Sequence, residues 1–385
     1  MFTIPPAIEQ ILETFCQNGH EAYLVGGCVR DLLCRKQPHD YDITTSADPQ
    51  TVLALFPKTI QTGVKHGTVT VLSGGYAVEV TTYRTDGEYR DSRRPETVTF
   101  VKSLREDLAR RDFTVNAIAY HPKTGLQDPF NGRKDIQNRL LRAVGDPRRR
   151  FTEDALRILR LFRFSSQLGF VIEPDTLQAA LACADALPHI SAERIKSELC
   201  RTLNGANPAA LAPLTAAGKL TFLGINSPNY PAITSLQGDT ALFAFLWSGG
   251  ADMATALESL KASNREKTFC RQMIALFTLP FPADKPAIKN RLAATSPSVF
   301  KEYLLCSNAL FQTDIRSASA MFQEILDRQE PYLISHLAVD GQDLKSLGIS
   351  GKKIGKTLEA LRQTVVLDPA QNQRETLLAH ARSGL

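Results

Sequence analysis

The chain has 385 residues, of which 43% are hydrophobic and 22% charged, and its formal net charge is +5. These values are ordinary for globular proteins, so they exclude a disordered, collagen-like or coiled-coil chain and favour about two to four domains. The mildly basic balance is compatible with a nucleic-acid partner but does not establish one.

The sequence shows no targeting or membrane segment. The N-terminal residues lack a signal-peptide pattern, and no apolar run approaches the roughly 20 residues of a membrane span. Seven scattered cysteines include no CxxC pair, which argues against a structural zinc site. Free thiols favour a reducing compartment, so we expect a cytoplasmic protein.

Strand and helix signals alternate over the first 145 residues or so, and helical signals dominate from about residue 150. The elements expected in the first part are helices at 7–18 and starting at 29–33, strands at 23–25 and 40–44, and a hairpin of 68–72 and 77–84. In the hairpin, Val78 and Val80 share one face while Ala77, Glu79 and Thr81 share the other. In the second part, 153–168 and 191–203 are expected helices.

Asp40 and Asp42 form the first chemical constellation. If both lie on one strand they point the same way, about 6.5–7 Å apart, and repel each other unless a cation sits between them. Mg²⁺ suits such a pair and leaves room for substrate phosphates, as in phosphoryl or nucleotidyl transfer. Glu79 is a candidate third carboxylate. A bare Asp-x-Asp is most often only a solvated turn, so its context decides.

That context begins with Gly26 and Gly27, which separate a strand from a helix that carries Arg30. A glycine turn at a helix N-terminus exposes backbone N–H groups that suit phosphate, and Arg30 is placed to contact a triphosphate oxygen. A lone Gly-Gly pair is usually just a turn. The order of strand, Gly-Gly, helix and Asp-x-Asp strand is much more specific.

Two arginine-rich segments follow. Arg111, Asp112 and Asn116 combine side chains that can contact phosphate, ribose and backbone, although a surface charge cluster is an alternative. Asp154, Arg157, Arg160 and Arg163 follow at i, i+3 spacing along one expected helical face. An ion-pair ladder explains one Asp–Arg pair but not three neighbouring arginines, whereas a polyanion facing them would.

Asp154 and Arg157 also offer base recognition. A carboxylate accepts from an exocyclic amine, and a guanidinium donates to a ring nitrogen or a carbonyl. Cytosine and adenine both carry an amino group beside a ring acceptor. The two side chains are therefore able to select C and A in place of a template base.

These motifs occur in an order that resembles class II tRNA nucleotidyltransferases, the bacterial and eukaryotic CCA-adding enzymes and the bacterial poly(A) polymerases. The matching segments are LVGGxVRD at 24–31, DxD at 40–42, RDFTxNA at 111–117, EDxxRxxRxxRF at 153–164 and ERIxxEL at 193–199. The resemblance is dense over about residues 20–203. Residues 83–95 resemble the flexible loop of the enzymes that add the complete CCA.

The resemblance implies an α+β fold: a nucleotidyltransferase head with a mixed β-sheet and helices, followed by an all-α neck, body and tail in a seahorse-like arrangement. The implied domains are a catalytic head (1–148), a base-recognising neck (149–206), a body (207–300) and a tRNA-binding tail (301–385). The body carries no readable motif. In the tail, Lys352, Lys353 and Lys356 are candidate tRNA contacts, and a solvated helix start is equally compatible with them.

The implied activity is addition of C, C and A to the 3′ end of tRNA from CTP and ATP with Mg²⁺. Asp40 and Asp42 would bind metal, with Glu79 as the third catalytic carboxylate, either a metal ligand or an outer-shell group. The implied nucleotide-binding residues are Gly26, Gly27, Arg30, Arg111, Asp112, Asn116, Asp154, Arg157, Arg160 and Arg163.

Other functions remain open from sequence. A poly(A) polymerase and a partial CC- or A-adding enzyme share the same head. A non-catalytic RNA-binding protein would not need intact Asp40, Asp42 and Arg157. A small-molecule nucleotidyltransferase would need neither the later arginine motifs nor a long helical region. The oligomeric state stays open, a homodimer included.

Overall fold

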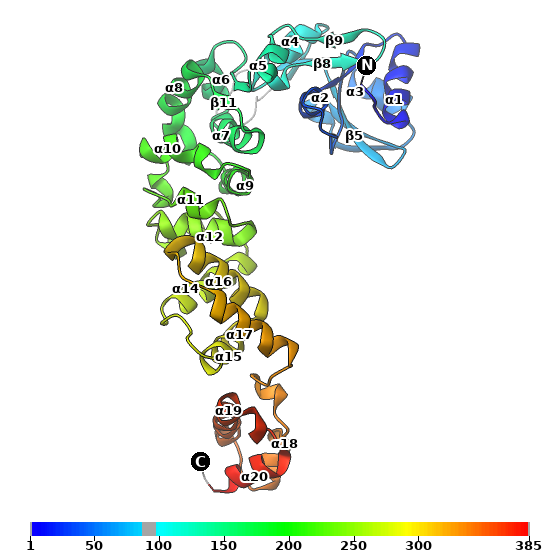
Figure 1. The fold of residues 1–385 in the computed structure, drawn as a ribbon. Coiled ribbons are helices and arrows are strands. Elements are labelled where there is room, and N and C mark those ends of the chain that lie inside the picture. Colours follow the sequence, from blue (N-terminus) through cyan, green and yellow to red (C-terminus); the bar gives the residue numbers. More distant parts are fainter. Residues whose placement is uncertain (1, 87–97, 384–385) are drawn as a thin grey trace. The chain divides into compact units, whose positions relative to one another are not determined.

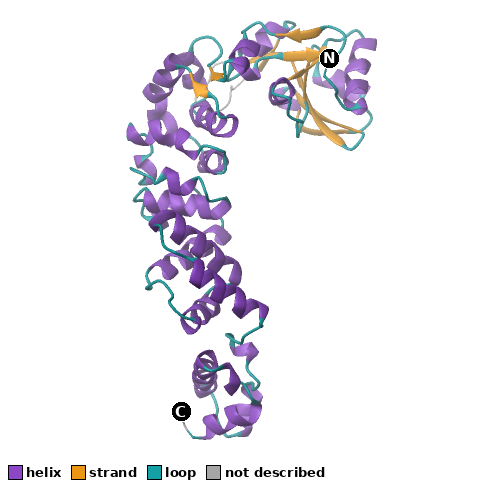
Figure 2. Ribbon diagram, viewed as in Figure 1, coloured by secondary structure: helices purple, strands orange, loops and turns teal. Residues whose placement is uncertain are grey.

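The computed structural model describes residues 2–86 and 98–383, which form two compact units. The first comprises residues 1–227 with 259–261, and the second comprises 228–258 with 262–385. Figure 1 and Figure 2 show that strands are confined to the N-terminal part and that the remainder is helical. Within the described ranges, no helix is long and apolar enough to cross a membrane. The predicted division into four domains stays a prediction.

A seven-stranded mixed sheet forms the centre of the head, in the order β3-β4-β5-β2-β1-β8-β9. Its strands are β1 (Ala22–Val25), β2 (Asp42–Thr45), β3 (Thr59–Gly63), β4 (Thr68–Ser73), β5 (Tyr76–Thr82), β8 (Ala119–His121) and β9 (Gly125–Gln127). β2 and β5 run parallel, and the other neighbouring pairs are antiparallel. The predicted mixed sheet and its hairpin are confirmed.

One face of this sheet is covered by helices and the other is open over β4 and β5. α1 (Pro6–Gln17) and α3 (Pro49–Leu55) contact β4. The buried alternate residues of the hairpin are Val69, Val71, Val78 and Val80. Burying each valine contributes roughly 1.5–3 kcal/mol, which fixes the register because a one-residue slip would expose all four. Glu79 and its same-face neighbours are left on the open side, as the alternation predicts.

Short elements within residues 84–86 and 98–141 complete the head. They are β6 (Arg84–Asp86), β7 (Val98–Phe100), α4 (Leu104–Ala109), η2 (Thr114–Asn116), α5 (Gly132–Gln137) and β10 (Leu140–Leu141). α5 lies against η2, and a Cβ at Gly132 would lie 2.0 Å from the Thr114 carbonyl oxygen. The Asp128 carboxylate accepts the Gly132 N–H at 2.7 Å, which holds the helix start in this close approach.

The predicted continuous helix from residue 153 is interrupted. α6 (Pro147–Glu153) ends at Asp154, whose backbone is extended, and α7 (Leu156–Leu168) begins two residues later. The prediction that Asp154 shares a helical face with Arg157 is therefore wrong. α7 packs against α9 (Ala192–Leu203). A short strand, β11 (Val171–Ile172), pairs with β10 and is the exception to the helical signal after residue 150.

Helices account for the rest of both units. The first unit continues with α8 (Pro174–Cys183), η3 (Ala184–His189), η4 (Pro208–Leu211), α10 (Ala212–Ala216) and η5 (Thr221–Leu223). The second contains α11 (Tyr230–Ile233), α12 (Gly238–Ser248), α13 (Met253–Ser259), α14 (Asn264–Phe277), α15 (Lys285–Ala294), α16 (Pro297–Phe311) and α17 (Arg316–Asp327). Aromatic rings fill its interior, with Phe277 4.9 Å from Tyr303 and 5.8 Å from Phe243 between centroids.

The C-terminal helices have a hydrophobic core of their own. They are η6 (Ile334–His336), α18 (Gly341–Ser346), α19 (Lys352–Leu367), η7 (Pro369–Gln371) and α20 (Arg374–Arg382). Their core is formed by Val339, Leu344, Leu358, Leu361, Val365, Leu377 and Ala381. A polar contact joins α19 to α15, because Arg362 donates to the Asn290 side chain at 3.1 Å.

Candidate active site

Two carboxylates face each other at the centre of the sheet. Asp42 is the first residue of β2, and Glu79 lies directly opposite on the parallel neighbour β5. Side chains paired in this way leave the same face of a sheet, so both carboxylates lie on the open side. Asp40 is not on the strand as predicted but in an exposed bend two residues earlier. The strand geometry therefore brings Asp42 and Glu79 together, whereas Asp40 approaches from the preceding loop.

The pKa of Asp42 reflects the nearby carboxylates. Burial, and next the Glu79 carboxylate, raise the pKa of Asp42 to about 6; Asp40 adds to the rise and Arg111 opposes it. Two like charges placed this closely disfavour ionisation of one of them. The strand thus holds a carboxylate in an environment that favours a cation beside it.

The donor set fits a hard divalent cation. No three His, Cys, Asp or Glu side chains in the described ranges already converge into a metal-binding group. Mg²⁺ does not need such a cage, since it binds through one or two carboxylates and completes its shell with water and substrate phosphates. Asp42, with its raised pKa, and the exposed Asp40 supply oxygen ligands of this kind.

A glycine turn lies directly above the carboxylates. Gly26 has φ +78° and caps α2 (Gly27–Leu33), so the predicted strand–turn–helix order is confirmed. A Cβ at Gly26 would lie 3.2 Å from the Arg111 guanidinium and 3.9 Å from the Asp42 carboxylate. The absence of a side chain therefore lets Arg111 and Asp42 lie close to the backbone of the turn.

Arg30, in α2, belongs to a buried polar chain that crosses from the head to α7. Its guanidinium donates to Asp31 at 2.7 Å and to Asn116 at 2.8 Å, and it stacks on the Phe164 ring at 5.2 Å. The Asn116 amide in turn donates to Asp112 at 3.0 Å. The structure thus brings three sequence-predicted residues into one network that joins α2, η2 and α7.

Asp112 is the anionic centre of that network. Its carboxylate accepts two hydrogen bonds from Arg160, at 2.6 and 2.9 Å, and one from the Phe113 N–H at 2.8 Å. Burial alone would raise the pKa of Asp112, but Arg160 and then Asn116 outweigh it and hold the pKa at about 2. Asp112 therefore stays ionised at neutral pH and holds the Arg160 guanidinium in place.

Each arginine of α7 is paired with a carboxylate of the protein. Arg160 binds Asp112, and Arg163 lies 2.6 Å from Glu198 of α9. Arg157 donates to Glu153 at 2.8 Å. The sequence favours a facing polyanion as the balance for these arginines, but protein carboxylates from separate elements already pair with them. Arg160, with a side chain 33% exposed, is the member most open to a ligand.

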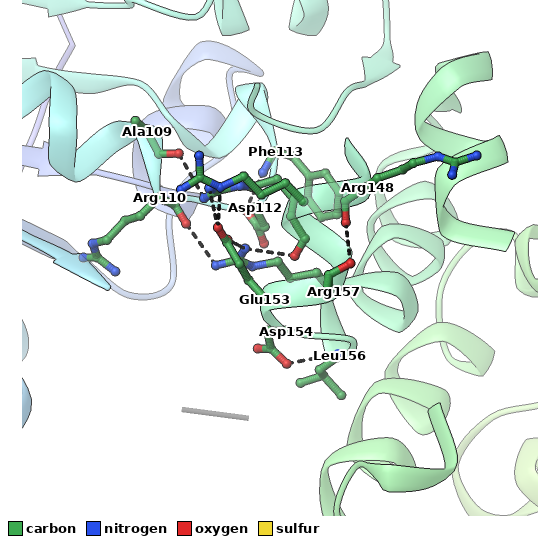
Figure 3. A network of polar contacts seen from close by, with 12 residues as sticks. Ala109, Arg110, Asp112, Phe113, Arg148, Glu153, Asp154, Leu156 and Arg157 are labelled. Atoms are coloured by element: carbon green, nitrogen blue, oxygen red, sulfur yellow. Dashed lines mark hydrogen bonds and ion pairs between the residues drawn. The ribbon is translucent and has the colours of Figure 1, made fainter. Parts of the chain in front are cut away.

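The predicted base-reading pair, Asp154 and Arg157, is held by different partners (Figure 3). Arg157 donates to the backbone carbonyls of Arg150 and Arg110 as well as to Glu153. Asp154 accepts from the Leu156 N–H at 3.1 Å with one oxygen and from Arg194 at 2.9 Å with the other. Both side chains are thus oriented before any nucleotide arrives, and neither is bonded to the other.

Sequence reasoning missed one central residue, Asp107. This fully buried carboxylate of α4 accepts from Arg110 at 2.8 Å, from Arg111 at 3.4 Å and from the Thr44 hydroxyl at 3.0 Å. It thereby connects the arginine segment to strand β2, which begins at Asp42. Its position three and four residues before Arg110 and Arg111 was a readable signal. Its bond to Thr44, 63 residues away, was not.

Two other predicted features lie elsewhere. Lys352, Lys353 and Lys356 are exposed in the first turns of α19 in the second unit. Of the loop at 83–95, residues 83–86 are described, and residues 87–95 lie outside the described residues.

Comparison with known protein families gives three consecutive matches. Residues 22–142 match the poly A polymerase head domain, 169–218 match the RNA- and SrmB-binding site of polymerase A, and 235–381 match tRNA nucleotidyltransferase domain 2. Together these regions cover most of the sequence from the sheet to the C-terminal helices.

Similar proteins include several CCA-adding enzymes. The enzyme of Geobacillus stearothermophilus is 53% identical over 206 residues, an alignment that covers 54% of this chain and 51% of that protein. The chain thus aligns with only about half the length of such relatives. The enzyme of Lacticaseibacillus paracasei is 38% identical over 382 residues, covering 96% of this chain and 94% of that protein.

Solved structures extend the likeness over the whole fold. The CCA-adding enzyme of Bacillus stearothermophilus in complex with CTP superposes with a TM-score of 0.85 at 32% identity, covering 99% of this chain and 98% of that one. The Thermotoga maritima enzyme complexed with tRNA shares the fold alone, with a TM-score of 0.70 at 20% identity, covering 99% of this chain and 96% of that one.

The mixed-sheet head, its facing carboxylates and its glycine turn define a nucleotidyltransferase. The helical region that follows is that of the enzymes acting on tRNA ends. This chain belongs to the class II CCA-adding enzymes.

Proposed function

We propose that this protein adds C, C and A in turn to the 3′ end of tRNA, using CTP and ATP. The observation that carries the proposal is the Asp42–Glu79 pair beneath the Gly26 turn, with Arg111 beside it. The 32% identical Bacillus stearothermophilus enzyme, described in complex with CTP, supports CTP as a substrate. The likeness to the tRNA-bound Thermotoga maritima enzyme concerns the fold only, so tRNA follows from family membership.

In the proposed reaction the tRNA 3′-hydroxyl attacks the α-phosphorus of the nucleotide. A new O3′–P bond forms, the bond to the β-phosphate oxygen breaks, and pyrophosphate leaves. A divalent cation held by Asp40 and Asp42 would neutralise charge on the triphosphate and favour the ionised 3′ oxygen. The protein itself acts mainly by positioning and by electrostatic stabilisation.

The remaining site residues place the incoming nucleotide. The Gly26–Gly27 turn and Arg111 lie where the triphosphate meets Asp42, and Arg160 stands at the edge of the same space. Arg30, Asn116 and Asp112 maintain the network behind them. Asp154 and Arg157 stand ready to read the base, which for cytosine and adenine presents an amine beside a ring acceptor.

Further features of the proposal concern the tRNA and the setting. The lysines at 352, 353 and 356 would contact tRNA phosphates, and the loop resemblance at 83–95 favours addition of the complete CCA. A cytoplasmic location and a homodimer remain predictions.

The test is end-sequencing of a tRNA that lacks CCA after incubation with CTP, ATP and Mg²⁺. We expect most products to end in CCA with both nucleotides and in CC with CTP alone. Asp42→Asn is expected to abolish incorporation, while Glu9→Gln, at an exposed position of α1, serves as the matched control and stays active. Long A tails on a generic RNA with ATP alone would instead identify a poly(A) polymerase. Absence of turnover would identify a non-catalytic RNA-binding protein.

A further inference from the structure

The two sides of the Asp42–Glu79 pair differ in their charged residues. The groups proposed for the nucleotide lie on the side of β1, α2 and α7, where arginines and the glycine turn gather. On the other side of Asp42, the open face continues across β5, β4 and β3. These three strands contain no lysine or arginine.

The register of the strands defines what this second side presents. Asp42 lies opposite Glu79, Glu79 opposite Thr70, and Thr70 opposite Ile60, so these side chains form one row across four strands. Leu72 and Ala77 form the next row toward the hairpin turn. We call Ile60, Thr70, Leu72 and Ala77 the acceptor face.

The acceptor face is exposed although most of it is apolar. Ile60 is 44% and Leu72 39% exposed, and Ala77 is also exposed, whereas the valines of the opposite face are buried. Contiguous exposed apolar patches mark binding surfaces, and here the apolar side chains share one sheet face with Asp42 and Glu79. With strands about 4.8 Å apart, Thr70 lies roughly 10 Å and Ile60 roughly 14 Å from Asp42, which is the reach of one or two nucleosides.

The chemistry of this surface fits one of the two substrates. A triphosphate would find no lysine or arginine on these three strands and would meet Glu79. A 3′-terminal nucleoside instead offers a sugar and a flat ring, which pack against methyl groups and hydroxyls. During CCA addition that nucleoside changes at each step, so its seat must not read base edges, and aliphatic contacts impose no hydrogen-bond pattern.

We propose that the acceptor face seats the last nucleosides of the tRNA 3′ end, so that the two substrates reach Asp42 from opposite sides. The inference rests on the proposed function and assigns a surface for the second substrate. In this arrangement the base of the incoming nucleotide is selected on the side of Asp154. The 3′-terminal nucleoside of the tRNA is held without base selection on the side of β3–β5.

The test reverses charge at one position. Leu72→Asp is expected to raise the KM for tRNA about fivefold through repulsion of RNA phosphates, and Leu72→Lys to lower it, with the KM for CTP within twofold of wild type. Gln61→Asp and Gln61→Lys are the matched controls, since Gln61 is exposed on β3 and alternates to the other side from Ile60. Both are expected to leave the two KM values within twofold.

Equal effects at positions 72 and 61, or a KM for CTP that moves with the KM for tRNA, would overturn the inference. A second measurement on the unmodified protein does not depend on how the variants fold. A tRNA ending in 4-thiouridine, irradiated in the complex, is expected to crosslink to β3, β4 or β5, and a crosslink confined to other elements would also reject the inference. A wild-type protein that incorporates no CMP would reject the proposed function itself.

Discussion

The surroundings of Asp42 oppose ionisation of its carboxyl group. Burial and Glu79 raise the pKa of Asp42 to about 6, far above the ordinary range of an aspartate. A group whose pKa is higher in the folded than in the unfolded protein stabilises the fold. This stabilisation is complete at pH values below the pKa in the unfolded protein, and it is lost as the pH rises through the pKa in the folded protein. Ionised Asp42 therefore destabilises the metal-free protein at neutral pH.

Because ionised Asp42 destabilises the fold, an Asp42→Asn substitution should change the stability of the protein in a pH-dependent way. We expect the variant to be more stable than wild type at pH 8 by about 1–2 kcal/mol, after a discount for partial exposure. Near pH 4 the two proteins should differ little, since Asp42 is then protonated in wild type. Urea unfolding in the presence of a chelator at both pH values measures this. A variant less stable than wild type at pH 8 would contradict the raised pKa.

Arg194 illustrates a residue that acts through another. It holds one oxygen of Asp154 at 2.9 Å, across 40 residues of sequence. Arg194→Ala is expected to reduce discrimination of CTP over UTP about tenfold, because a charge-assisted bond of roughly 1.5 kcal/mol no longer orients the carboxylate. The ratio of kcat/KM values for the two nucleotides provides the measurement. Partial recovery in Arg194→Lys is the control, and unchanged discrimination in Arg194→Ala would reject a positioning role.

At the residue scale, local sequence motifs identified most residues of the candidate site. They did not identify the residues that hold them in place. Asp42, Glu79, Arg111 and the Gly26 turn lie together as predicted from sequence. Strand alternation identified Glu79 because the hairpin pattern has period two. The residue that ties Arg111 to the catalytic strand, Asp107, escaped because its contact with β2 is tertiary.

At the element scale, α4 is anchored to β2 by one buried carboxylate, that of Asp107. Asp107→Asn is expected to destabilise the protein by about 3–5 kcal/mol, since it leaves the two arginine charges without their buried partner. Thr44→Val removes only a neutral donor and should cost roughly 1 kcal/mol. Guanidinium unfolding of both variants compares the two. Equal costs would show that Asp107 carries no more than its bond to Thr44.

The break between α6 and α7 shows where periodicity misleads. Charge and apolar residues repeat at helical spacing through Asp154, so the sequence favours one helix from residue 153. The chain instead extends at Asp154, where the carboxylate accepts the Leu156 N–H and meets Arg194. Local spacing describes a helix face but cannot reveal a partner that arrives from α9.

At the scale of the whole molecule, the two units predict more than one unfolding step. The residues proposed to bind the nucleotide all lie in the first unit. CTP at 100 times its Kd should therefore stabilise that unit by about 2.7 kcal/mol and leave the second unit unchanged. Differential scanning calorimetry with and without CTP, assigned by hydrogen exchange, separates the transitions. A uniform shift of all transitions would indicate that the chain unfolds as one cooperative body.

The charged residues are distributed unevenly along the chain. Residues 101–163 contain 15 basic and 8 acidic residues, a net of +7, and the remaining 30 basic and 32 acidic residues give −2. This asymmetry was legible in the sequence, as were the mixed sheet and the change to helices. The division into two units was not, because it depends on which helices pack together, and the body carries no motif to indicate it.

Gly132 is a position at which any substitution should disrupt the fold, although the residue has no proposed role in the reaction. Any side chain there would occupy the position of the Thr114 carbonyl, in the turn that leads to Asn116 and the network around Asp112. In a genetic selection for loss of function, mutations at this codon should appear beside those of the aspartates that we propose to be catalytic. Their signature would differ: protein of low abundance, not abundant protein that fails to turn over.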